Sequence, residues 1–493
     1  MSLKILVGTY NVNKQDIDQD LTSWLFPTNS SITDKPDIIV VGFQEFNPFP
    51  NAFFTNSSYL SNTSLSSSIT QVGNKSFFLG SWSKYVSNEE ERLEHCTGLI
   101  ERAIFVNTKE SYTALVKSTF VGLALFVYVR DKSVTRRILN VEIAKCGVGP
   151  FWIGNKGGVG VRIVINANAF NEEQDYVNEN RVNNIRGLAL CFVCAHLSPH
   201  NHNTYQRNRD FKSICERLVF VNNMYSENTD RDSTQEQRED CEIMMTNMEG
   251  EDLTPLLPSY HNRQQQYFTI YDSDFLFFFG DLNYRIELKE QEGLNNTTLT
   301  ISGLLDILRT RQYQRIRACD QLAREVIDGR VLHGFEEGEL DFLPTYKYYV
   351  GSENEFDVRR RTPGWCDRIF YYWRKSDDTQ RSDLNGAGSV EQSSPISLIN
   401  YTSHPSYTLS DHKPVSALFA ITPQHERLVV KAGTSNSPFK KDETRVLKFA
   451  IGEASSIIVG CLWWLIGTER GVKIILIIGG IGFFGLWLVR KLT

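Results

Sequence analysis

Short apolar runs, rich in β-branched residues and separated by polar turns, recur along most of the chain. Such runs are typical of strands, whereas helical spacing is found only around residues 211–219 and 304–308. Many strands with few helices between them predict an α/β protein in which two largely antiparallel sheets pack together, with helices outside. The predicted strands are residues 3–12, 36–46, 99–107, 120–129, 158–165, 187–197, 274–283, 368–373 and 415–421.

Three polar segments interrupt this pattern at residues 55–76, 226–266 and 376–395. They are rich in serine, asparagine, glutamine or charged residues, so we predict insertions or surface loops.

The C-terminal pattern is different. Twelve of the eighteen residues in 472–489 are Leu, Ile, Val or Phe, which favours a membrane-spanning helix over a buried core helix. Residues 454–467 form a shorter apolar run, which we interpret as interfacial or re-entrant, with a hairpin of two membrane helices left open. The pattern divides the chain into a catalytic domain (1–423), a basic juxtamembrane linker (424–450) and a membrane anchor (451–493).

The net charge and the cysteine content indicate which partners and which cellular compartment to expect. The net charge of −6 in 493 residues gives no general attraction to nucleic acid, and we expect no nucleic-acid partner. Nine scattered cysteines and an N-terminus without a signal-peptide core indicate a reducing compartment. We therefore expect a tail-anchored protein on the cytosolic face of an intracellular membrane, the endoplasmic reticulum or another endomembrane.

The stretch EHCTGLIER, residues 94–102, has the cysteine-to-arginine spacing of a cysteine-dependent phosphatase loop. Such a loop runs into a helix whose N-terminus faces the phosphate. Here residues 102–107 alternate like a strand, and Glu101 would place a carboxylate against the phosphate. We therefore interpret Cys96 as a structural residue on a buried strand.

Polar side chains stand where several predicted strands stop. A hydrophobic run that ends at a carboxylate, amide or imidazole presents that group on a rigid base, which an active site needs. One such residue is typical of a turn, but five instances favour a shared site. They are Asn11 with Asn13, Gln44 with Glu45, His196, Asp281 with Asn283, and Asp411 with His412.

The motifs around these residues resemble those of the inositol polyphosphate 5-phosphatases. The resemblance covers residues 1–423 and implies the DNase I-like fold of the exonuclease-endonuclease-phosphatase superfamily, a four-layer α/β/β/α sandwich. The chain departs from the usual pattern at Tyr10, at Gly364 and in PFW before the shared IGNKGG. The motifs are TYNVN, GFQEF, IGNKGGVGVRI, CAHLS, FFGDLNYRI, FLPTYKYY, RRRTPGWCDRIFY and LSDHKPV.

The resemblance implies a Mg²⁺ cofactor. Glu45 would bind this hard cation through carboxylate oxygen, with Asn11, Asn13 and Asp411 close to its coordination shell.

The catalytic roles are also implied by the resemblance. Asp281, beside Asn283, would orient and deprotonate the attacking water. His412, paired with Asp367, would donate to a phosphate oxygen, and His196 would do likewise. In-line attack would give hydrolysis without a phosphoenzyme.

Substrate choice would depend on basic residues. In the family, positions corresponding to Tyr346, Lys347, Arg359 and Arg361 hold the phosphate next to the one removed. This favours phosphatidylinositol 4,5-bisphosphate, with the 3,4,5-trisphosphate and soluble inositol polyphosphates left open. Lys156 and Arg285 complete the expected substrate-binding set.

Three other functions share some of these features. A membrane-anchored neutral sphingomyelinase shares the fold but has no use for the PTYK motif or the arginine clamp. A nuclease of the same fold should show a basic stripe. A catalytically silent phosphoinositide-binding module would be expected to lose Glu45, Asp281 or His412, and all three are present.

Overall fold

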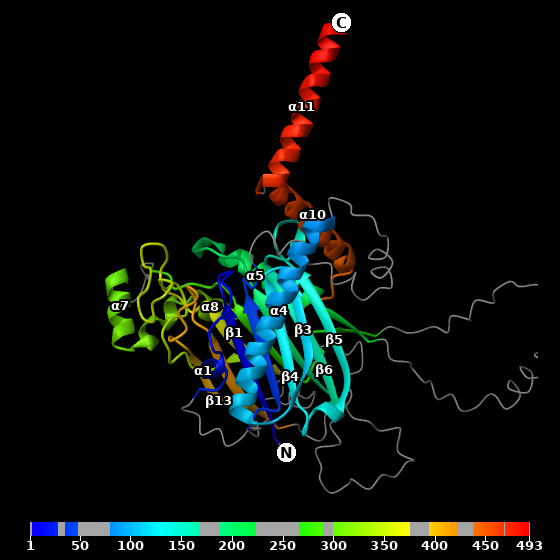
Figure 1. Ribbon diagram of the computed structural model, residues 1–493. Helices are drawn as coiled ribbons and strands as arrows, with labels where there is room; N and C mark the ends of the chain where they lie inside the picture. Colours follow the sequence, from blue (N-terminus) through cyan, green and yellow to red (C-terminus); the bar gives the residue numbers. More distant parts are fainter. Residues whose placement is uncertain are drawn as a thin grey trace, which may run out of the picture.

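The computed structural model describes residues 2–27, 35–47, 79–166, 187–222, 266–288, 299–374, 394–422, 437–467 and 469–492. Two six-stranded sheets dominate this part of the chain (Figure 1). The first sheet has the order β13 (Ile396–Ser403), β14 (Val415–Ile421), β1 (Leu3–Asn11), β2 (Ile38–Gln44), β4 (Leu123–Arg130) and β3 (Tyr112–Phe120).

The second sheet has the order β11 (Glu336–Glu337), β12 (Asp367–Trp373), β10 (Phe275–Asp281), β7 (Gly187–His196), β6 (Gly157–Asn166) and β5 (Ile138–Gly147). Each sheet contains one parallel pair, β1 with β2 and β7 with β10, and the other pairs are antiparallel. The prediction of two largely antiparallel sheets is therefore confirmed. A separate two-stranded sheet joins β8 (Val219–Asn222) to β9 (Gln266–Thr269).

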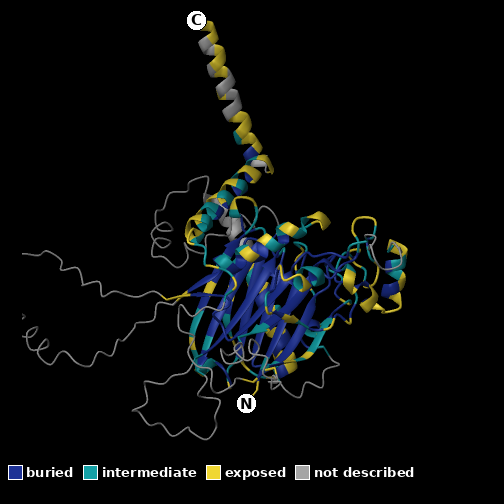
Figure 2. Cartoon of the chain, turned by 180° about the vertical axis from the view of Figure 1, so that it is seen from behind, coloured by how far each residue is buried: buried dark blue, intermediate teal, exposed yellow. Residues whose placement is uncertain are grey.

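The two sheets pack face to face around a buried apolar core. Phe277 of β10 contacts Phe419 of β14 across this core, with 5.0 Å between ring centroids. Helices cover the outer faces: α1 (Thr22–Leu25) and α4 (Leu79–Thr108) lie on the first sheet, and α5 (Thr204–Arg217) lies on the second. The central strands are buried on both sides (Figure 2), which explains their nearly continuous apolar sequences. The expected four-layer sandwich is confirmed.

Two helices follow the predicted helical spacing. Residues 211–217 lie in α5, whose buried face includes Phe211 and Ile214, and residues 304–308 lie in α7 (Ile301–Arg309). A further short helix, α8 (Gln321–Ile327), begins with Asp320 as its N-cap. A short 3₁₀ turn, η2 (Pro150–Trp152), precedes β6.

One predicted strand is wrong. Residues 99–107 belong to α4, where Cys96, Ile100, Ala103 and Ile104 face the first sheet and Phe105 points to solvent. The spacing of four between Cys96, Ile100 and Ile104 is helical, whereas the alternation in 102–107 is too short to separate the two periods.

Most of the predicted polar segments fall outside the described residues. This holds for 55–76, for 226–266 except Gln266, and for 376–395 except its last two positions. Of the predicted linker 424–450, the structure describes residues 437–450, and the helix α10 (Arg445–Gly467) already begins within it.

A second C-terminal helix, α11 (Glu469–Leu492), extends away from the sandwich (Figure 1). In the described part of the chain, α10 alone is long and apolar enough to cross a membrane, with a mean hydropathy of 1.7 over its best window. The predicted span 472–489 lies in α11, where several side chains are outside the described residues, so that span and the hairpin stay predictions.

Candidate active site

Strands from both sheets end at one edge of the sandwich. On the second sheet, Asp281 stands opposite His196 of β7 and opposite Asp367 of β12. On the first sheet, Asn11 is the last residue of β1. Its Nδ2 donates to Asp281 Oδ2 at 2.9 Å, and this bond joins the two sheets. The carboxyl ends of the two parallel pairs therefore meet, as the strand-end pattern predicted.

Asp281 is the centre of this edge. The same Oδ2 lies 3.2 Å from His196 Nε2 and 3.9 Å from His412 Nε2, while Oδ1 accepts from the Asn283 backbone N–H at 3.0 Å. Burial opposes ionisation of Asp281, but the charges and hydrogen bonds of His412, His196 and Lys156 outweigh it and hold the pKa far below its usual range. These neighbours therefore favour the ionised form of Asp281.

His412 pairs with a second buried carboxylate. Its Nδ1 lies 2.9 Å from Asp367 Oδ2, which also accepts from Thr345 Oγ1 at 2.6 Å. Burial opposes protonation of His412, but Asp367 and Asp281 outweigh it and raise its pKa to about 9. At neutral pH His412 is an imidazolium, which can donate to an anion.

Lys156 brings a further positive charge to the edge. It comes from the turn before β6, and its ammonium contacts the ring of His196. Burial lowers the pKa of Lys156, although Glu45 and Asp281 oppose this shift. Burial and the charge of Lys156 lower the pKa of His196, although Asp281 and Glu45 oppose this shift.

Glu45 follows β2 in a left-handed conformation, with φ of 49°, and its Oε2 lies 3.1 Å from Lys14 Nζ. Burial opposes ionisation of Glu45, but His196, Lys156 and Lys14 outweigh it and lower the pKa. Asn13 is also left-handed, with φ of 48°, and its N–H donates to Asn11 Oδ1. Carboxylate and amide oxygens are the ligands that a hard cation prefers.

Two of the three expected metal-binding residues form ion pairs with lysines. Asp411 forms an ion pair with Lys347, while Glu45 pairs with Lys14. Within the described residues, the group whose potential ligand atoms lie within 4.8 Å of one another is Asp281, Asp367 and His412. His412 Nδ1 lies 2.9 Å from Asp367 Oδ2 within this group, which fits the expected pairing of these two residues. The metal assignment of Glu45, Asn13 and Asp411 stays a prediction.

Aromatic and basic side chains line the site beside His412. The Tyr346 ring lies 4.3 Å from the His412 ring, and the Arg285 guanidinium lies 4.2 Å from the Tyr346 centroid. Arg285 Nη2 donates to Asn283 Oδ1. Its buried Nε and Nη1 have no hydrogen-bond partner among the described residues, and these donors suit an anionic substrate.

Arg359 and Arg361 are exposed on the loop before β12. Arg361 Nη2 lies 3.3 Å from His200 Nδ1, which places His200 beside the predicted clamp. Sequence reasoning missed His200, Lys14 and Thr345. Each neighbours a recognised motif, but its role depends on a partner remote along the chain.

Cys96 is structural, as predicted, although it lies on a helix. It is 1% exposed against the core under α4, and burial raises the pKa of its thiol well above the usual value. A thiol of this kind is not a nucleophile at neutral pH.

Comparisons with known proteins show which family the sequence resembles. The sequence profile of Endonuclease/Exonuclease/phosphatase family 2 matches residues 8–418. Type II inositol 1,4,5-trisphosphate 5-phosphatase of Mus musculus is 26% identical over 422 residues, 85% of this chain and 30% of that protein. Type I inositol polyphosphate 5-phosphatase 1 of Arabidopsis thaliana is 29% identical over 318 residues, 63% of this chain and 39% of that protein.

Synaptojanin-2 of Homo sapiens is 24% identical over 449 residues, 86% of this chain and 23% of that protein. The chain thus spans less than two-fifths of the length of these three relatives.

A solved structure supports the fold. The inositol polyphosphate 5-phosphatase domain of spsynaptojanin, in complex with inositol (1,4)-bisphosphate and calcium ion, matches with a TM-score of 0.50 and 21% identity, over 92% of this chain and 90% of that chain. The resemblance to inositol polyphosphate 5-phosphatases is confirmed by these relatives. Because the family profile covers most of the sandwich and the site lies within it, the chain belongs to Endonuclease/Exonuclease/phosphatase family 2.

Proposed function

We propose that this chain is a Mg²⁺-dependent phosphoinositide 5-phosphatase that hydrolyses the 5-phosphate of phosphatidylinositol 4,5-bisphosphate. The relatives named as inositol polyphosphate 5-phosphatases support the reaction, a phosphoric monoester hydrolysis. The observation that carries the proposal is the ionised Asp281, held between Asn11, His196 and His412. The 3,4,5-trisphosphorylated lipid and soluble inositol polyphosphates are further candidate substrates.

Hydrolysis needs a positioned water and donors for the phosphate oxygens. Asp281 accepts a hydrogen bond from the water, whose oxygen attacks phosphorus in line as the bond to the inositol oxygen breaks. The same carboxylate orients the water and accepts its proton as the new bond to phosphorus forms. The His412 imidazolium donates to the phosphate as its charge develops, with His196 beside it. The water gives up one proton and the departing inositol oxygen takes one up, so the products are inorganic phosphate and the inositol alcohol.

Glu45, Asn11, Asn13 and Asp411 are the oxygen donors proposed to hold Mg²⁺. The ion would withdraw charge from the phosphate and lower the cost of bringing an anion to Asp281.

A second phosphate on the substrate gives the selectivity. Tyr346 and Lys347 lie beside His412, and Arg359 and Arg361 are exposed near His200. Guanidinium forks match phosphate oxygens in a bidentate way, which favours a 4-phosphate next to the one removed.

The C-terminal helices support a membrane location. The apolar run 472–489 lies in α11, which extends away from the sandwich, so we propose that the enzyme acts on the cytosolic face of an intracellular membrane, where its lipid substrate and the bilayer are its partners.

The silent-module alternative is disfavoured by the complete set of contacts around Asp281. A sphingomyelinase would release phosphocholine in place of inorganic phosphate, and a nuclease would act on DNA or RNA, so product analysis separates both alternatives from the proposal.

The test uses the full chain purified in detergent. We expect phosphate release from phosphatidylinositol 4,5-bisphosphate with Mg²⁺, complete loss on chelation, and restoration when Mg²⁺ returns. Cys96→Ser should leave kcat unchanged, because the buried thiol is remote from this chemistry. Phosphocholine release, or activity that resists chelation and fails in Cys96→Ser, would overturn the proposal.

Arg361→Ala should lower kcat/KM more for substrates that carry a 4-phosphate than for substrates that lack it. A lost charge-assisted contact costs about 1.5 to 3 kcal/mol, which is about tenfold or more in kcat/KM. The matched control is Arg360→Ala, because Arg360 lies 3.6 Å from Asp357 and is equally exposed. Equal losses on both substrates would contradict the clamp.

A further inference from the structure

One face of α10 is packed against protein. Gly452, Ser456, Gly460 and Trp464, spaced by four residues, are its buried positions. The closest approach is at Gly452, where an added Cβ would lie 2.3 Å from the carbonyl oxygen of Trp152. Only a glycine permits the helix to come this close to the 3₁₀ turn of η2.

The first loop under α10 leads directly to Lys156. The loop folds tightly: the Val148 N–H donates to Lys156 O at 2.7 Å and the Gly149 N–H donates to Ile153 O at 3.1 Å. Trp152, at its tip, lies against Gly452. Any shift of this tip is therefore passed to the residue whose ammonium contacts His196.

The second loop under α10 supports Glu45. The Phe449 ring stacks on Phe120 with 6.2 Å between centroids, and Val459 packs against Val121. Phe120 ends β3, and the turn that follows is bonded to the residues after Glu45: the Phe46 N–H donates to Gly122 O at 2.9 Å, and Asn47 Nδ2 donates to Val121 O at 3.0 Å. The helix thus rests on both loops that present charged groups to the site.

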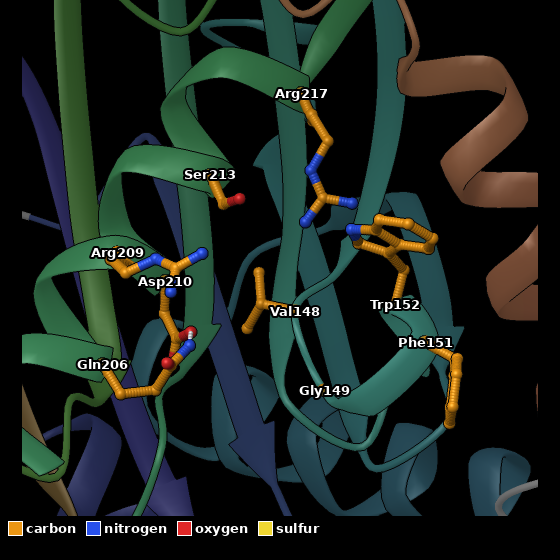
Figure 3. Close-up of a pocket in the computed structure, with 9 residues that line it drawn as sticks. All are labelled: Val148, Gly149, Phe151, Trp152, Gln206, Arg209, Asp210, Ser213 and Arg217. Carbon is orange, nitrogen blue, oxygen red and sulfur yellow. Dashed lines mark hydrogen bonds between the residues drawn. The ribbon is translucent and has the colours of Figure 1, made fainter.

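The segment before α10 is fastened to the sandwich as well. Phe439 lies against Phe211 of α5, with 6.0 Å between ring centroids, and the Asp442 N–H donates to Glu216 O at 3.0 Å. Figure 3 shows the loop of Gly149 and Trp152 between α5 and the ribbon of α10, beside a pocket of about 210 Å³. The described end of the predicted linker is therefore part of the folded domain.

We propose that α10 is a positioning element of the active site, which holds the Trp152 loop and the turn after Phe120 so that Lys156 and Glu45 keep their places at the site; this inference rests on the phosphatase function proposed above. A helix with this face on protein cannot also place it in lipid. The catalytic unit therefore extends to Gly467, and α11 is left to attach the enzyme to the membrane.

The test compares variants of the full chain in detergent on soluble inositol 1,4,5-trisphosphate, so that membrane access plays no part. Gly452→Leu should push α10 off Trp152. We expect kcat to fall by about 10- to 100-fold, since small misplacements in an active site have effects of this size. Hydrogen exchange of the amides in residues 148–156 should become faster, because their support is loosened. Phe449→Ser introduces no clash, and it should change both quantities in the same direction by less.

Gly467→Leu is the matched control. Gly467 is exposed, and a Cβ there would approach only Trp463 of the same helix, at 3.7 Å. It should retain the kcat and exchange of the parent chain. Parent-like kcat and exchange in both Gly452→Leu and Phe449→Ser would overturn the proposal. If the parent chain released no phosphate from any inositol phosphate, the proposed function would fail, and the exchange comparison would still decide whether α10 holds the loop.

Discussion

Asp281→Asn should lower kcat by about a hundredfold or more while the KM for substrate changes little. The amide keeps the shape of the carboxylate but loses the charge that orients the attacking water. It also removes one of the three carboxylates that raise the pKa of His412, so the donor to the phosphate is weakened at the same time. Steady-state kinetics at neutral pH with saturating Mg²⁺ measure both constants.

A matched substitution stands at the other end of the same strand. Asp274 immediately precedes β10, is buried, and accepts a hydrogen bond from the Ala189 N–H at 2.8 Å. Asp274→Asn should lower the melting temperature without changing kcat per folded molecule. A raised KM with an unchanged kcat in Asp281→Asn would contradict the role given to this carboxylate.

The site could be located from sequence because its residues stand at strand ends. Asn11 and Asp281 each close a long apolar run, and buried strands of this kind place their last residues at a rigid edge. What the pattern could not supply was the order of the strands. The bond between Asn11 and Asp281 joins positions 270 residues apart, and only the packing of the two sheets brings them together.

The alternation of apolar and polar residues gave a wrong element where a short run fits both the helical and the strand period. Residues 102–107 alternate like a strand, yet α4 is 30 residues long and most of it precedes them. The length of this segment and the four-residue spacing of Cys96, Ile100 and Ile104 are those of a helix. Among the strands of the two large sheets, β3, β5 and β13 were not predicted, because all three mix exposed and buried positions and have weak apolar runs.

The charge pairs of the site were beyond sequence reasoning for another reason. Lys14 with Glu45 and Lys347 with Asp411 are ion pairs whose members come from different loops. Each lysine could equally serve a phosphate, a carboxylate or solvent, since an ammonium has no preferred partner geometry. The three-dimensional neighbours decide, and in this structure they place a positive charge beside each acidic residue proposed to hold Mg²⁺.

His412→Ala should lower kcat by about a hundredfold or more, because it removes the imidazolium that stabilises charge on the phosphate. The pH profile gives a sharper test than the rate alone. With a pKa raised to about 9, the donor form of His412 is present below that pH and is lost as the pH rises through it. The parent enzyme should therefore lose activity around pH 9, and the residual activity of His412→Ala should not show that fall.

Two further variants make this assignment specific. Asp367→Asn removes the carboxylate 2.9 Å from His412 Nδ1, so the pKa of His412 should fall. The loss of activity at high pH, the basic limb of the pH profile, should then move to lower pH. His404 is a buried histidine that lies 2.8 Å from Ser416 Oγ, and burial lowers its pKa to about 4. His404→Ala should keep the basic limb of the parent enzyme. A basic limb that stays at the same pH in both His412→Ala and Asp367→Asn would assign it to another group, and the imidazolium would lose its place in the mechanism.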